Sequence, residues 1–182
     1  LGHDPEGWHQ LGLAASLAVI ASGFTAYAWL GRLAGKQAAL IGSVLYMSAP
    51  YHLAVDLYQR FFFAELWGFV WMPLVMLFTR ASLRAGAGAL AGLSVSYALL
   101  IMTHLPTTLL FSWVPVAYVL WMAEPGDRLG PFVRVAGGML LGMGLSAIYL
   151  LPAMATQEYV RFDIMRSGHF DFAKHFLFYV PG

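Results

Sequence analysis

The chain has 182 residues, of which 60% are hydrophobic and 10% are charged, with a formal net charge of +1. Soluble globular domains carry about 25% charged residues, so this composition excludes an ordinary soluble fold. The sequence has no basic stripe and its net charge is close to zero, so it does not indicate a nucleic-acid partner. The absence of cysteine excludes disulfides, thiolate catalysis and cysteine-bound metals within these residues.

Long uncharged runs predict an integral membrane protein whose partner is the lipid bilayer. Residues 11–30 carry no charge, and the uncharged run 85–123 is too long for one crossing of ~20 residues. Division at charges and prolines predicts an all-α polytopic bundle with helices at about 11–31, 37–50, 64–79, 85–103, 107–123 and 133–154, and a tail at 155–182. Because the sequence starts at Leu1, we expect a single transmembrane domain from a longer chain.

Two features inside these helices carry structural expectations. Pro73 and Pro115 fall within the third and fifth helices and should kink them, with neighbouring helices satisfying the freed carbonyls. GxxxG patterns at 88–92 and 138–142 favour close helix packing within the bundle.

The charged residues of the predicted loops are distributed unevenly between the two sides of the membrane, which predicts the orientation of the chain. One side collects Arg32, Lys36, Arg80, Arg84, Arg128 and Arg134, with two acids, Glu124 and Asp127. The other side receives four basic residues, seven acids and all six histidines. By the positive-inside rule the first side is cytoplasmic. Both ends of the chain, and any chemistry, are therefore expected on the extracytoplasmic face.

The polar stretch between the second and third predicted helices is the main candidate site. If a helix continues from Pro50, then His52, Asp56 and Arg60 lie at i, i+4 and i+8 and share one face. Arg60 can pair with Asp56, or with Glu65 at the start of the next helix. Such an ion pair would neutralise charge at the membrane boundary and orient the hairpin, without further function.

The same residues are also suited to binding a substrate and to catalysis. The planar guanidinium of Arg60 fits a phosphate, which makes Arg60 a candidate substrate-binding residue together with His52. Asp56 and Glu65 are candidate catalytic groups, as a general base or as ligands of a divalent cation. An arginine between two acids competes with a cation, so we predict no metal site and leave the cofactor unknown.

Two further polar pieces fall on the same predicted face. His104, in the turn between the fourth and fifth helices, is either a capping residue or a phosphate contact. In the tail, Asp171 and His175 are candidate binding residues. Their spacing matches no standard zinc signature, and a solvated segment on the membrane surface is the simpler interpretation.

Several motifs together resemble a bacterial membrane family, the "6-pyruvoyl-tetrahydropterin synthase-related" integral membrane domain. The resemblance is carried by residues 45–53, 56–60, 64–65, 103–106, 145–153 and 168–176. The chain departs from the family's usual pattern at Phe61 and Phe62, where that pattern has arginine and glycine.

The resemblance implies kinship with GT-C glycosyltransferases of the bacterial cytoplasmic membrane, which take a polyprenyl-phosphate-linked sugar as donor and act on the outer face. It implies that Asp56, Arg60, Glu65, His104, Asp171 and His175 line a binding cleft. GT-C enzymes place a catalytic acid in the first outer loop, which we expect upstream of Leu1. The alternative is a non-catalytic envelope protein that binds, or helps assemble, lipid-linked glycans.

Overall fold

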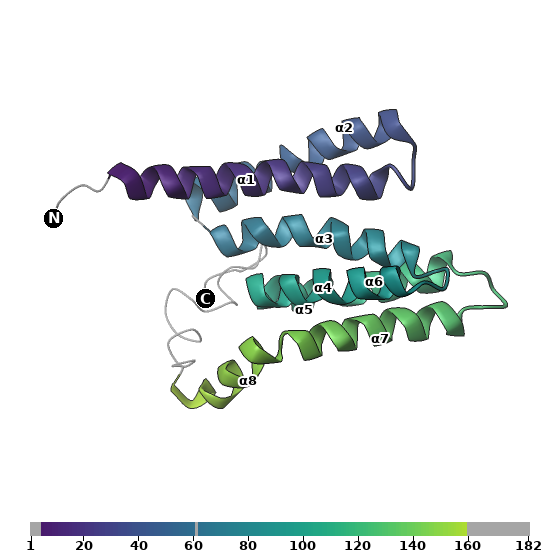
Figure 1. The fold of residues 1–182 in the computed structure, drawn as a ribbon. Helices are drawn as coiled ribbons and strands as arrows, with labels where there is room; N and C mark the ends of the chain where they lie inside the picture. The colour runs from purple at the N-terminus through teal and green to yellow at the C-terminus, as the bar shows by residue number, and fades with distance from the viewer. Residues whose placement is uncertain (1–4, 61, 160–182) are drawn as a thin grey trace, which may run out of the picture. The chain divides into compact units, whose positions relative to one another are not determined.

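The computed structural model describes residues 5–60 and 62–159, and every regular element in those ranges is a helix (Figure 1). In chain order the elements are α1 (Pro5–Leu30), α2 (Lys36–Met47), the π-helix η1 (Tyr51–Gln59), α3 (Phe63–Ala81), α4 (Ala87–Thr103), α5 (Leu105–Phe111), α6 (Trp113–Met122), α7 (Leu129–Leu145), α8 (Ala147–Ala155) and the short 3₁₀ helix η2 (Gln157–Tyr159). The predicted all-helical class is confirmed for these residues.

The chain divides into two compact units, Leu1–Ser146 and Ala147–Gly182. In the described part, the second unit consists of α8 and η2. All of the helix packing and the candidate site described below belong to the first unit.

Several predicted helices are broken in the structure. The stretch predicted at 107–123 forms α5 and α6, because the ring of Pro115 would clash with the carbonyl of Phe111, where α5 ends. The stretch predicted at 133–154 forms α7 and α8, and the small residues Gly142, Gly144 and Ser146, which favour helix poorly, lie at the break.

Three helical stretches are long and apolar enough to cross a membrane: His9–Leu30, Lys36–Gln59 and Leu105–Met122. The broken pair Leu129–Leu145 and Ala147–Ala155 makes a fourth if it counts as one span. By length and composition, the described residues therefore hold three or four candidate spans, where the sequence predicted six. Large apolar side chains such as Phe24, Leu110 and Trp121 are exposed on these helices, which suits contact with lipid.

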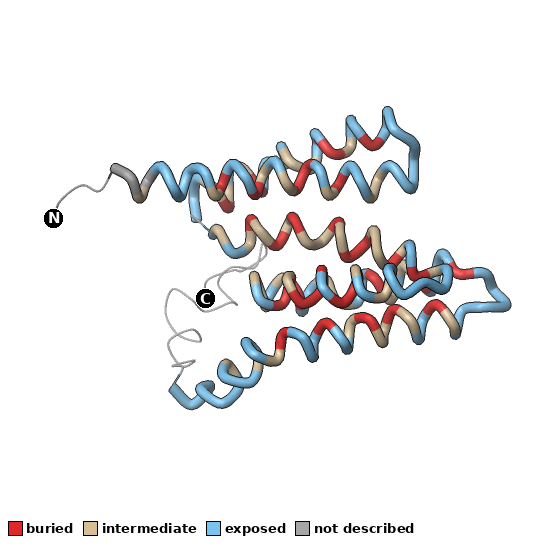
Figure 2. Tube along the Cα trace, viewed as in Figure 1, coloured by how far each residue is buried: buried red, intermediate tan, exposed pale blue. Residues whose placement is uncertain are grey.

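Helix α3 lies at the centre of the first unit. It packs against α1 on one side and α4 on the other, while α2 packs on α1 and α7 packs on α4 (Figure 1). The buried positions follow these contacts (Figure 2). Between α1 and α3, the small side chains of Ala15 and Ala18 meet Leu66 and Val70. Small residues at such an interface let two helix backbones approach closely.

The contact between α4 and α7 confirms the predicted packing role of the second GxxxG pattern. A Cβ atom added to Gly142 would lie 2.7 Å from the carbonyl oxygen of Ser94, and one added to Gly138 would lie 2.8 Å from the side chain of Leu93. In the first pattern, Gly92 likewise faces the ring of Phe78 on α3, whereas Gly88 faces open space.

Candidate functional site

The candidate site begins at η1, a nine-residue π-helix that starts directly after Pro50. Its end is marked by an i→i−5 hydrogen bond of 2.9 Å, in which the Arg60 amide donates to the Val55 carbonyl. The Phe62 amide then donates to the Asp56 carbonyl, also at 2.9 Å, which turns the chain into α3. π-Helical turns are rare and are found mostly at functional sites.

The three polar residues of this segment differ in how far they are exposed. His52 and Asp56 are both buried, at 6% and 1% exposure, whereas Arg60 is exposed. Arg60 is the C-cap that follows η1, so the regular α-helix on which the predicted common face depended does not extend to Arg60. The side chain of Arg60 instead turns toward the start of α3.

His52 is packed among aromatic rings. Its imidazole stacks on the ring of Phe69 with a centroid separation of 3.8 Å, and the edge of Tyr46 approaches it at 5.0 Å. A ring held in this way between η1, α2 and α3 joins the helices together. His52 is thus a packing residue behind the site, and the structure gives it no open face toward a ligand.

Arg60 and Glu65 form an ion pair across the turn between η1 and α3. Arg60 Nη1 lies 3.7 Å from Glu65 Oε2, and the two side chains are 46% and 13% exposed. Tyr51 supports both partners, because its hydroxyl donates to Glu65 Oε1 at 3.1 Å and accepts from Arg60 Nη1 at 3.4 Å. Of the two pairings that the sequence left open, the structure has the one with Glu65.

The ring of Phe62 connects Arg60 to His104. The Arg60 guanidinium lies over the ring, 4.7 Å from its centroid, and the His104 imidazole meets the ring edge-on at 5.9 Å. A guanidinium over an aromatic face is attracted to it by about 0.5–1 kcal/mol when exposed. Phe62 therefore brings together two predicted binding residues that are far apart in the sequence.

His104 is the single residue between α4 and α5, with an extended backbone. Its carbonyl accepts the Thr108 amide at 3.1 Å, and its Nδ1 lies 2.7 Å from the Thr107 hydroxyl. One residue earlier, Thr103 accepts a hydrogen bond of 3.0 Å from Trp71 Nε1, which fixes this turn against α3. His104 thus occupies the predicted capping position, while its ring stays beside Phe62.

Asp56 is the most unusual group in the site. Both carboxyl oxygens are buried, and neither has a hydrogen-bond partner among the described residues. Burying a carboxyl without a hydrogen-bond partner costs free energy, and no hydrogen bond from the described residues offsets that cost.

The remaining site predictions divide between those within and those outside the described residues. Asp171 and His175 lie outside them. Within residues 5–60 and 62–159, no group of three or more His, Asp or Glu residues is placed to hold a metal ion. Arg60, Glu65 and His104 are brought together, whereas His52 and Asp56 lie behind them in the interior.

The contacts of Tyr51, Phe62 and Phe69 with the polar residues of the site were not predicted from the sequence. No local spacing in the sequence signals that Tyr51 reaches Glu65, fourteen residues away. The contact of His104 with Thr107 could have been predicted from the sequence, because residues three apart are neighbours at the start of a helix.

Comparisons of the chain with protein-family models, with curated proteins and with solved structures find no match.

Proposed function

We propose that this chain belongs to a membrane protein that binds the phosphate of a polyprenyl-phosphate-linked sugar at Arg60 and takes part in transferring that sugar. The observation that carries the proposal is the half-exposed guanidinium of Arg60, held in place by Tyr51, Glu65 and Phe62 with His104 beside it. A guanidinium that is fixed and still exposed can bind phosphate oxygens in a bidentate manner with little further ordering.

The surroundings of Arg60 suit the rest of such a ligand. The ring of Phe62 lies against the Arg60 guanidinium and is exposed. Aromatic rings can pack against a sugar or a polyprenyl chain, and the imidazole of His104 can donate to a phosphate oxygen. These groups form the substrate-binding part of the proposal.

For transfer, the proposal assigns Glu65 the role of base. Its carboxylate would take the proton of an acceptor hydroxyl as that oxygen bonds to the anomeric carbon of the sugar. The bond from the anomeric carbon to the phosphate oxygen would break, and the departing phosphate would keep the electron pair and be stabilised by Arg60. Asp56, which is sealed from solvent, has no access to an acceptor in this structure.

The membrane topology is part of the proposal. We assign six crossings in a GT-C-like arrangement to α1, α2 with η1, α3, α4, α5 with α6, and α7 with α8. Helices α3 and α4 have 19 and 17 residues, which falls within the range of 17–25 residues for a crossing helix. The positive-inside rule then puts Arg60, Glu65 and His104 on the extracytoplasmic face of a bacterial cytoplasmic membrane.

A second candidate function, a non-catalytic protein that binds lipid-linked glycans, is favoured by one observation. Both acids near Arg60 are engaged or hidden: Glu65 is paired with Arg60 and bonded by Tyr51, and Asp56 is buried. In this function Glu65 would only orient Arg60.

The test compares Arg60→Ala with Arg128→Ala, which removes an exposed arginine from the opposite side. Because charge-assisted hydrogen bonds contribute about 1.5–3 kcal/mol, we expect Arg60→Ala to weaken polyprenyl-phosphate-sugar binding roughly 10- to 100-fold. Arg128→Ala should bind as the parent does. Unchanged binding by a folded Arg60→Ala protein would refute the proposal. Sugar transfer lost in Glu65→Gln, with binding retained, separates the enzyme from the binding protein.

A further inference from the structure

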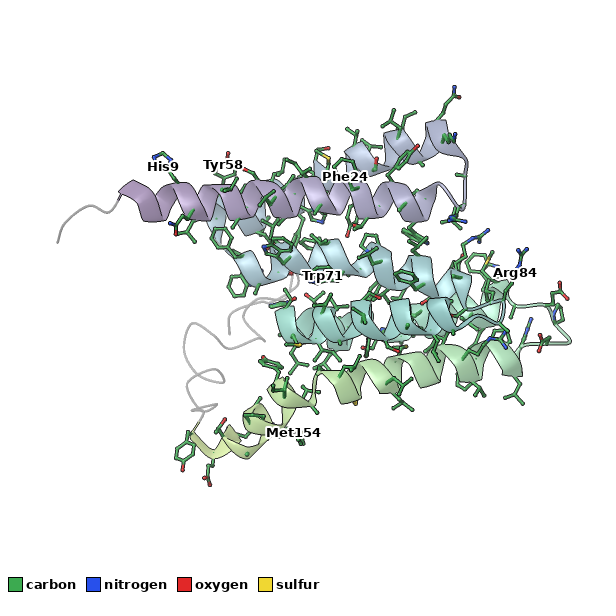
Figure 3. The ribbon with its side chains drawn as sticks, viewed as in Figure 1. His9, Phe24, Tyr58, Trp71, Arg84 and Met154 are labelled. Atoms are coloured by element: carbon green, nitrogen blue, oxygen red, sulfur yellow. The ribbon has the colours of Figure 1, made fainter. Side chains whose placement is uncertain are left out.

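A second polar site lies at the other end of α3. A pocket of about 520 Å³ opens where α1 and α3 end, and it is lined by three arginines: Arg32 after α1, Arg80 in the last turn of α3, and Arg84 in the turn that follows. Glu65 stands in the first turn of α3 and Arg80 in its last, about 22 Å apart at 1.5 Å per residue. Figure 3 shows Arg84 at the end away from Tyr58.

The three guanidinium groups have no acidic partner in the part of the chain that the structure describes. There the pair between Arg60 and Glu65 is the sole contact within 4.0 Å between a basic and an acidic side chain. Glu124 and Asp127, the acids predicted on this side, therefore form no ion pair with any of the three arginines. Positive charges brought together without carboxylates repel one another and favour an anion between them.

Within the described residues, the last carbonyls of α3 accept no hydrogen bonds from the side chains of these three arginines. Arg134, from α7, donates to the carbonyls of Ser82 at 2.9 Å and Leu83 at 3.0 Å. Arg80 is oriented by a hydrogen bond of 3.0 Å from its Nη1 to the Tyr118 hydroxyl. That bond uses one of the five N–H groups of a guanidinium, so the others stay available to a ligand.

The rest of the pocket is apolar. Its other lining residues are Leu77, Phe78, Ala81, Leu83 and Met122. A pocket lined by both arginines and aliphatic or aromatic side chains matches an amphiphile, whose charged group and hydrocarbon chain need both kinds of surface. A free inorganic anion would gain nothing from the apolar walls.

We propose that this pocket binds the phosphodiester headgroup of an anionic phospholipid, with Arg32, Arg80 and Arg84 around the phosphate and the acyl chains along Leu77 and Met122. The proposal does not depend on the function proposed for Arg60, because the two sites lie at opposite ends of α3. It would make the lipid a structural ligand joining the ends of α1 and α3.

The test titrates the purified full chain with phosphatidylglycerol or phosphatidylcholine of the same acyl chains and counts bound lipid by native mass spectrometry. The test variant carries Arg32→Gln and Arg84→Gln, two exposed residues for which no side-chain hydrogen bond occurs within the described residues. The matched control carries Lys36→Gln and Arg128→Gln, which remove the same charge on the same side but outside the pocket. A third variant adds Arg80→Gln to the test variant, so that all three arginines of the pocket are removed.

At about 1 kcal/mol for each basic residue near a lipid headgroup, the test variant should lose roughly 10-fold or more in phosphatidylglycerol affinity. The control should change less than about 2-fold, and phosphatidylcholine should bind all the proteins equally weakly. Equal losses in the test variant and the control would overturn the proposal, since charge alone would then explain binding. Displacement of phosphatidylglycerol by millimolar inorganic phosphate would also overturn it, in favour of a site for a free anion.

Discussion

The hydroxyl of Tyr46 donates a hydrogen bond of 2.9 Å to the carbonyl of Phe69. Phe69 stands four residues before Pro73, so this is the carbonyl that Pro73, having no N–H, leaves without a helical partner. A side chain from α2 thus completes the backbone of α3, as expected where a proline interrupts a helix in a membrane. It explains how α3 continues through Pro73 beside the candidate site.

The first prediction concerns this hydrogen bond. Tyr46→Phe removes the hydroxyl and leaves the Phe69 carbonyl unsatisfied, which should lower the free energy of unfolding by about 0.5–1.5 kcal/mol. The measurement is chemical denaturation of the detergent-solubilised protein. In a Pro73→Ala background the backbone amide gained at that position can serve the carbonyl instead, so the same Tyr46→Phe change should cost clearly less. Equal costs in the two backgrounds would show that the bond has no connection with Pro73.

The second prediction tests the close approach of α4 and α7. Gly142→Ala introduces a Cβ atom 2.7 Å from the backbone oxygen of Ser94, and backbone cannot move aside as a flexible side chain can. We expect a loss of about 1–3 kcal/mol in stability, as for other overpacked contacts. Gly144→Ala is the matched control on the same helix, since its Cβ would meet nothing within 4 Å. A Gly142→Ala protein as stable as the Gly144→Ala protein would contradict the packing described for these helices.

The third prediction tests the orientation. The sequence has no cysteine, so single cysteines report cleanly on each side. Gln59→Cys, at the end of η1, and Ala85→Cys, in the turn after α3, are both exposed positions. A membrane-impermeant maleimide added to intact cells should label Gln59→Cys and leave Ala85→Cys unlabelled until the cells are lysed. The reverse pattern would place Arg60 and Glu65 on the cytoplasmic side. It would then contradict the proposed binding of a sugar donor on the extracytoplasmic face.

Much of the architecture could be predicted from the sequence because it depends on local signals. Uncharged apolar runs identified helices, and GxxxG identified the close approach at Gly138 and Gly142. The pair between Arg60 and Glu65 was foreseen as one of two options, since both partners lie near one turn. Such features need only the residue types and their spacing.

The rest of the site could not be predicted because it depends on tertiary contacts and on an irregular helix. Apolar periodicity does not distinguish a π-helix from an α-helix. It therefore could not predict the burial of Asp56 or the outward turn of Arg60. The meeting of Phe62 with His104 needs α3 and α4 to be packed side by side. No spacing along the chain reports that contact.

The last prediction concerns Asp56, whose carboxyl oxygens are buried without a described partner. Asp56→Asn keeps the shape and removes the charge, and a buried amide is less costly to desolvate than a buried carboxylate. We therefore expect the free energy of unfolding to stay the same or to rise, by up to about 2 kcal/mol, in the denaturation assay used for Tyr46→Phe. Asp127→Asn, at an exposed loop position, is the control and should change stability by less than about 0.5 kcal/mol. A clear loss of stability in Asp56→Asn would mean that the carboxylate has a favourable partner, which would have to come from outside residues 5–60 and 62–159. A higher stability would instead show that the Asp56 carboxylate lowers the stability of the fold, as residues of functional sites often do.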